Sequence, residues 1–165
     1  MSLYSEKQRQ AVLKRACDVV RARIDGKTSV TFGSGAARQT FDLETGGMCN
    51  RFVRQTIETA LGLAPFSWYF GSAKACLTLK KLAPYEVPLK YVQAGDILGF
   101  NGDPGHIALY IGGAFDPKKK LTAENTISGK RGMPRKAGTK VSSLSDQIKQ
   151  HGWTKAYRLF PTVKK

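Results

Sequence analysis

Residues 93–113, QAGDILGFNGDPGHIALYIGG, decide the fold of this chain. Two short runs within them, residues 96–100 and 107–111, are apolar and rich in residues that favour β-strands. The turn residues 101–104, NGDP, separate the two runs. Short apolar runs bounded by Gly and Pro predict two strands joined as a hairpin. His106 leads the second strand, where the sheet would hold its ring at an edge of the domain.

Two segments before this hairpin have the periodicity of amphipathic helices. Apolar side chains recur at helical spacing in residues 6–24 and again from Cys49 onward. Gly26 and Gly62 follow the two segments and suit helix ends. Cys49 is therefore expected to open a helix of about three turns. A further helix is predicted over residues 70–82.

Further strands are predicted at residues 29–32, 121–125 and 156–160. Helices that precede a run of strands predict an α+β domain with N-terminal helices packed on a central antiparallel sheet. The chain has 165 residues, of which 41% are hydrophobic. We therefore expect residues 1–165 to form a single domain with one core.

The chain is strongly basic, with 27 Lys and Arg against 12 Asp and Glu, a formal net charge of +15. Such a charge concentrates a protein on polyanions, although it also maintains solubility. Many of the basic residues lie in residues 118–140, where no aromatic residue occurs that could stack on bases. The pattern favours the backbone of a polyanion over specific recognition of nucleic acid.

The three cysteines, Cys17, Cys49 and Cys76, are widely spaced, and no CxxC pair occurs. With only two histidines in the chain, neither a zinc site nor a disulfide scaffold is predicted. Cys17 and Cys76 fall among apolar residues and are expected in the core. Cys49 differs from both because of its place at the start of a helix.

A cysteine at a helix N-terminus is favoured as a thiolate, since free N–H groups and the helix dipole stabilise the anion. Arg51 and Arg54 are nearby cations that could add to this effect. His106 is the candidate base. An inert buried thiol and a hydrogen-bonded histidine at a strand end are the structural alternatives. His151, in a polar stretch near the C-terminus, is expected to be a surface residue.

A third group is needed to orient the imidazole of His106. The segment 121–125 offers Glu124 and Asn125. Neighbours on a strand point to opposite faces of the sheet, so only one of the two can meet His106. Glu124 is preferred and Asn125 is the alternative.

The order of these motifs resembles that of the NlpC-type and CHAP-type peptidoglycan hydrolases. The motifs are a cysteine that opens a helix, the Gly95-Asp96 strand, the Gly105-His106 strand and the AENT segment 123–126. The resemblance covers residues 45–145 and implies a papain-like fold. It implies Cys49 as nucleophile, His106 as general base and Glu124 as the orienting residue. A Glu matches the CHAP-type pattern, whereas NlpC-type enzymes often have His there.

The chain also departs from the NlpC-type pattern. It has MCNR at residues 48–51, where those enzymes have Asp-Cys-Ser-Gly. This difference leaves the subfamily and the substrate pocket open. Candidate substrate-binding residues are Arg51, Lys130 and Arg131.

The resemblance implies hydrolysis of amide bonds in bacterial cell wall, by an endopeptidase or amidase that forms a thioester on its cysteine. No metal or organic cofactor is implied. The expected partners are peptidoglycan and its anionic polymers, and the protein is expected to be a monomer. Two alternatives remain open. One is another cysteine acyltransferase or deamidase on the same fold, and the other is a non-catalytic basic module that binds polyanions.

No apolar stretch of the sequence is long enough to cross a bilayer, and the first residues lack the apolar core of a signal peptide. A protein of this kind that acts on the cell wall is therefore expected to be delivered by a phage or prophage, or to be released from the cytoplasm.

Overall fold

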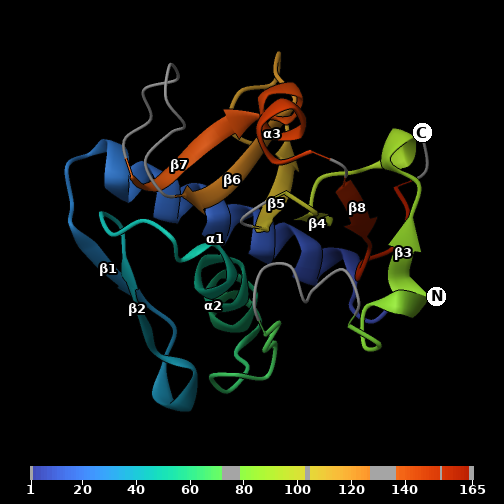
Figure 1. Ribbon diagram of the computed structural model, residues 1–165. Coiled ribbons are helices and arrows are strands. Elements are labelled where there is room, and N and C mark those ends of the chain that lie inside the picture. The colour runs from blue at the N-terminus through green and yellow to red at the C-terminus, as the bar shows by residue number, and fades with distance from the viewer. Residues whose placement is uncertain (1, 72–78, 103–104, 127–136, 153, 164–165) are drawn as a thin grey trace.

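The computed structural model describes residues 2–71, 79–102, 105–126, 137–152 and 154–163. Within these residues the chain combines helices with antiparallel sheets, as the predicted α+β class requires (Figure 1). The helices are α1 (Glu6–Ile24), α2 (Cys49–Leu61) and α3 (Leu144–His151). A small hairpin pairs β1 (Ser29–Phe32) with β2 (Gln39–Asp42).

The main sheet has six strands in the described residues, and every neighbouring pair is antiparallel. Across the sheet the order is β3 (Glu86–Val87), β8 (Thr154–Tyr157), β4 (Ile97–Phe100), β5 (His106–Gly112), β6 (Leu121–Thr126) and β7 (Gly138–Ser143). The predicted hairpin is present as β4 and β5, with Phe100 opposite His106. This register places His106 at the end of the sheet where the turn enters β5.

The two faces of the sheet are covered by different helices. On one face, Ile107, Leu109 and Ala123 join a large core with the apolar sides of α1 and α2. On the other face, Ala108 and Tyr110 form a smaller cluster against which α3 packs. Figure 1 shows α1 running behind the strands β5, β6 and β7. Alternating residues of β5 therefore reach both helical layers.

The ends of the first two helices follow from their sequence. Ser5 and Gln8 form a capping box at the start of α1, in which each side chain bonds the backbone of the other residue. Gly62 ends α2 in the left-handed conformation, with φ at 68°, which costs glycine little. Met48, at the N-cap of α2, makes no capping hydrogen bond from its side chain to the helix backbone. The N-terminal N–H groups of α2 are thus left for other acceptors.

Asp96, the acidic residue of the Gly-Asp strand motif, is a buried structural residue. Its carboxylate accepts hydrogen bonds from Arg158 Nε at 3.1 Å and Nη2 at 2.9 Å, and from the N–H of Gln93 at 2.9 Å. Burial raises the pKa of Asp96, and the contact with Arg158 opposes this. The ion pair connects the start of β4 to the end of β8.

Several predicted elements differ from those in the structure. The helix predicted over residues 70–82 is absent from residues 70–71 and 79–82, and its part at 72–78, with Cys76, lies outside the described residues. The strand predicted at 156–160 is found at Thr154–Tyr157 instead. The strands β2, β3 and β7 and the helix α3 were not predicted. In the part of the chain that the structure describes, no helix has the length and apolar character that a membrane span requires.

Candidate active site

Cys49 is the first residue of α2 and is only 8% exposed. The side chain of His106 and the backbone N–H groups of Asn50 and Ile107 lie near enough to its sulfur to lower the pKa of the thiol. The N–H of Asn50 is available because Met48 provides no capping side chain. The thiol therefore takes the place of a capping group at the positive end of the helix.

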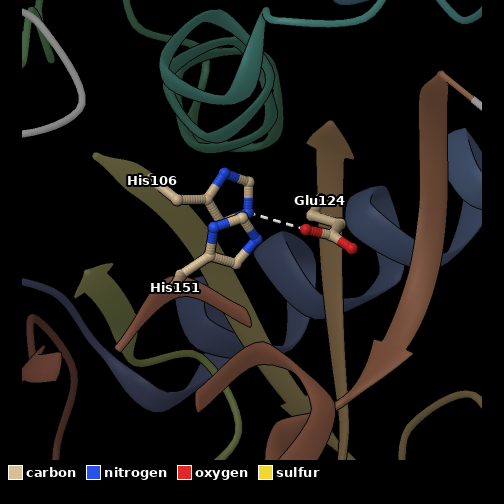
Figure 2. A group of neighbouring side chains, drawn as sticks. All are labelled: His106, Glu124 and His151. Atoms are coloured by element: carbon tan, nitrogen blue, oxygen red, sulfur yellow. Dashed lines mark hydrogen bonds and ion pairs between the residues drawn. The ribbon is translucent and has the colours of Figure 1, made fainter. Parts of the chain in front are cut away.

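His106 is the first residue of β5, and its side chain is 4% exposed. Its Nε2 lies 2.6 Å from Oε2 of Glu124, across the gap between β5 and β6. Figure 2 shows the other ring nitrogen pointing toward α2, the helix that Cys49 opens. The imidazole therefore lies between the thiol and the carboxylate.

Glu124 lies in the middle of β6 and has no exposed surface. Its Oε2 meets His106, and its Oε1 accepts a 2.6 Å hydrogen bond from Ser142 Oγ on β7. Lys140 Nζ is 3.9 Å from the same Oε1. Both oxygens of the carboxylate are engaged, which fixes its orientation toward the imidazole.

Asn125, the neighbour of Glu124, has a different place. Its Oδ1 accepts a hydrogen bond of 2.9 Å from the N–H of Met48, and its Nδ2 donates one of 2.9 Å to the carbonyl of Thr45. Asn125 thus holds the loop that leads into Cys49, on the opposite face of β6 from Glu124. The structure brings Glu124 to His106, as strand alternation allows for only one of the two.

The three groups change one another's pKa. Burial raises the pKa of Cys49, but the hydrogen bond and charge of His106 and two backbone N–H groups reverse this and hold it below 9.0. Burial lowers the pKa of His106, yet Cys49 and Glu124 raise it from 6.5 to about 9. Burial raises the pKa of Glu124, whereas His106 and Ser142 lower it from 4.5 to about 2. These shifts favour a thiolate–imidazolium pair, beside an ionised carboxylate, over a neutral thiol and imidazole.

The expected stabilisation of the Cys49 thiolate by Arg51 and Arg54 is not found. Arg54 forms a buried ion pair of 2.6 Å with Glu58, and Arg51 is exposed, with Nη2 3.4 Å from the carbonyl of Thr40. Neither guanidinium is among the groups that change the pKa of Cys49. Lys130 and Arg131 lie outside the described residues.

His151 is not the plain surface residue that the sequence suggested. It ends α3, and its ring stacks on that of His106, with centroids 4.2 Å apart and planes 19° apart (Figure 2). Phe100 packs 5.7 Å from both rings. Ser143 caps α3, and apolar residues at Leu144 and Ile148 have helical spacing. That pattern, followed by a glycine, is the signal that could have predicted the helix.

His106, Glu124 and His151 also place three potential metal-ligand atoms within 4.8 Å of one another. A histidine binds a metal ion through a nitrogen lone pair in the plane of its ring. Two nearly parallel, stacked rings cannot both direct such lone pairs at one ion without turning apart. The stacked geometry fits a hydrogen-bonded cluster better than a metal centre.

The site contains a buried thiol that favours the thiolate, a base beside it, and an acid that orients the base. These are the parts needed for nucleophilic attack on a carbonyl carbon. Comparison of the chain with models of known protein families, and with curated proteins, finds no match.

Proposed function

We propose that this protein is a papain-like cysteine hydrolase that cleaves amide bonds of bacterial peptidoglycan, as an endopeptidase or an amidase. The observation that carries the proposal is the chain of contacts from Cys49 through His106 to Glu124. A buried hydrogen-bonded series of this kind, at a helix N-terminus and a strand end, suits acyl transfer.

The proposed reaction begins with attack of the Cys49 thiolate on the carbonyl carbon of the amide. The C–S bond forms as the carbonyl π electrons move to oxygen, and the backbone N–H groups near the sulfur are placed to stabilise the oxyanion. When the C–N bond breaks, the imidazolium of His106 gives its proton to the leaving nitrogen. A thioester and a free amine result. Neutral His106 then takes a proton from water, which attacks the thioester and releases the acid.

Peptidoglycan is the proposed substrate for two reasons. The motif order resembles that of NlpC-type and CHAP-type hydrolases, and the net charge of +15 favours binding to the anionic polymers of a cell wall. Both observations concern the sequence, and the geometry of the site is compatible with them. Among the candidate substrate-binding residues, only Arg51 lies in the described part of the chain.

Isolated sacculi test the proposal. The protein should release soluble muropeptides, identified by mass spectrometry, and Cys49→Ala should abolish the release. Cys17→Ala is the matched control, because Cys17 lies on the buried face of α1 and burial raises the pKa of its thiol. It should retain the activity. The newly formed ends in the products also separate endopeptidase from amidase cleavage.

Two results would favour the alternatives. If the protein left sacculi intact but transferred an acyl group from a donor to an acceptor, the site would be that of an acyltransferase. Release of ammonia from a side-chain amide would indicate a deamidase. The wild-type protein could instead bind sacculi without releasing fragments, and its Cys49 thiol could react no faster than a free cysteine. These two results together would indicate a non-catalytic basic module.

A further inference from the structure

The face of α3 that packs on the main sheet carries two polar residues beside its apolar ones. Leu144 and Ile148 pack on the smaller apolar cluster of the sheet. Gln147 and His151 belong to the same face, because residues three and four positions apart are neighbours on a helix. Gln147 has no exposed surface. One side of α3 therefore brings an amide and an imidazole to the sheet.

These two polar residues lie beside the base and the acid of the candidate site. The ring of His151 stacks on that of His106, with centroids 4.2 Å apart (Figure 2). One helical turn earlier, the side chain of Gln147 lies near enough to Glu124 to lower the pKa of that carboxyl. Ser142 donates to Oε1 of the carboxylate and His106 meets its Oε2. A carboxylate has about four acceptor positions, so a third donor can be accommodated.

The amide of Gln147 is buried without a hydrogen bond of ordinary geometry. Neither its Nε2 nor its Oε1 has such a partner in the part of the chain that the structure describes. A buried amide in this state costs free energy that an apolar side chain of the same size would avoid. Hydrogen bonds around reactive groups are often poorly aligned in a free enzyme and tighten when substrate binds. An amide next to a buried acid fits that description.

The proposed reaction gives such a donor a purpose. When His106 passes its proton to the leaving nitrogen, the carboxylate of Glu124 faces a neutral ring. Burial, which raises the pKa of Glu124, is then opposed by fewer groups. Lys140 Nζ is 3.9 Å from Oε1, which is longer than a hydrogen bond. An N–H donor from α3 would keep the carboxylate ionised and oriented in both states of the imidazole.

We propose that Gln147 is a positioning residue for Glu124, whose carboxylate accepts its side-chain N–H and is thereby held toward His106. With His151 against the ring of the base, α3 is then part of the active site and not only a cover of the sheet. The inference rests on the proposed function for its part in turnover. The hydrogen bond itself is measurable without substrate.

NMR of labelled glutamate carboxyl carbons tests the inference, because the chain has five glutamates and Glu124→Gln identifies the signal of Glu124. Gln147→Met keeps the size of the side chain and removes the donor. The pKa of Glu124 should rise from about 2 by about 1 to 2 pH units, as expected for a hydrogen bond to a charged group. Gln147→Glu places a second carboxyl beside the first, so the pair should share a proton and titrate at higher pH still. A residue that only fills space would leave the pKa unchanged in Gln147→Met.

Gln10→Met is the matched control. Gln10 Nε2 donates to Oε1 of Glu6 at 2.9 Å on the exposed side of α1, so this variant should change the signal of Glu6 and leave that of Glu124 as it is. A second measurement needs no change at Gln147. The side-chain amide signal of Gln147 should shift when Glu124→Gln removes the charge. Alkylation of Cys49 near neutral pH should be about 2- to 10-fold slower in Gln147→Met, the factor that one hydrogen bond supplies.

An unchanged pKa of Glu124 in Gln147→Met would overturn the inference. So would an amide signal of Gln147 that does not respond to Glu124→Gln, and this measurement decides the question if neither Gln147 variant folds. The expected pKa changes in a protein that leaves sacculi intact would keep the inference and refute the hydrolase. Cleavage of sacculi by Gln147→Met at the wild-type rate, with no change at Glu124, would refute the inference and keep the hydrolase.

Discussion

Replacing Glu124 by glutamine removes one buried negative charge and leaves the size of the side chain almost unchanged. In the wild-type protein this carboxylate contacts the imidazole of His106 at 2.6 Å, and neither side chain is appreciably exposed. An opposite charge in contact with a titrating group changes its pKa by about 1 to 3 units. That is about 1.4 to 4 kcal/mol in favour of the imidazolium.

The consequence of Glu124→Gln should be visible at Cys49. Without the carboxylate, the pKa of His106 falls from its value of about 9, and the imidazolium that stabilises the thiolate is lost near neutral pH. Burial, the largest single influence on Cys49, then raises the pKa of its thiol relative to the wild-type protein. The reactive thiolate near neutral pH should therefore decrease by about 10-fold to 1000-fold.

The assay is the rate of alkylation of Cys49 by iodoacetamide as a function of pH. Trypsin releases this cysteine on the peptide of residues 39–51, separate from the peptide of residues 16–21 that carries Cys17. Mass spectrometry can then follow each thiol. The buried Cys17 has a raised pKa, so its slow alkylation reports that the protein stays folded.

Glu86→Gln is the matched control, since Glu86 forms a partly exposed pair of 3.1 Å with Lys155, on the strands β3 and β8. This variant should titrate like the wild-type protein. The reasoning would be refuted if Cys49 reacted with the same midpoint in Glu124→Gln as in the wild type. That result would mean that His106 stabilises the thiolate without help from the acid.

Three further predictions concern the surroundings of this pair. His151→Phe keeps a ring stacked on His106 and should retain most of the activity on sacculi. His151→Ala loses about 0.5–1.5 kcal/mol of ring contact and should reduce kcat about 2- to 10-fold. Equal kcat values for the two variants would contradict this prediction. Asn125→Ala leaves the N–H of Met48 without its acceptor and should lower the free energy of unfolding, measured in urea, by about 1–3 kcal/mol. An unchanged urea midpoint would show that this hydrogen bond does not stabilise the loop before Cys49. Because the folded-state pKa of Glu124 is depressed from 4.5 to about 2, its stabilisation is present above pH 4.5 and is lost as the pH falls toward 2. The free energy of unfolding should decrease more steeply over this window in the wild type than in Glu124→Gln, and parallel curves would argue against the buried carboxylate.

Much of the fold near the site could be predicted from local patterns. Helical periodicity located α1 and placed Cys49 at the start of α2, with Gly62 at its end. Strand alternation in residues 121–125 separated Glu124 from Asn125 before their partners were known. These features depend on residues close together in the sequence, where spacing alone determines which face a side chain occupies.

The missing parts of the prediction depend on contacts between distant residues. His151 reaches His106 only because α3 follows β7 and packs across β4 and β5. The close approach of Gly102 to the backbone of His151 also holds the end of α3 there. A Cβ at Gly102 would lie 2.7 Å from the carbonyl oxygen of His151. The role of Asn125 was missed for the same reason, since its partners Met48 and Thr45 lie 77 and 80 residues away.

The register of β6 connects these observations. Its two neighbouring polar residues support the start of α2 from both faces of the sheet: Glu124 through the imidazole of His106, and Asn125 through the loop before Cys49. A slip of one residue in β6 would exchange their faces and place an amide toward His106 and a carboxylate toward the loop. The six-residue ladder with β7 opposes such a slip, with Glu124 opposite Lys140 and Thr126 opposite Gly138. A Cβ at Gly138 would lie 2.4 Å from the carbonyl oxygen of Leu43, so the end of this ladder packs directly against the segment that leads to Cys49. The pairing of β6 and β7 therefore helps to determine the geometry in which Cys49, His106 and Glu124 meet.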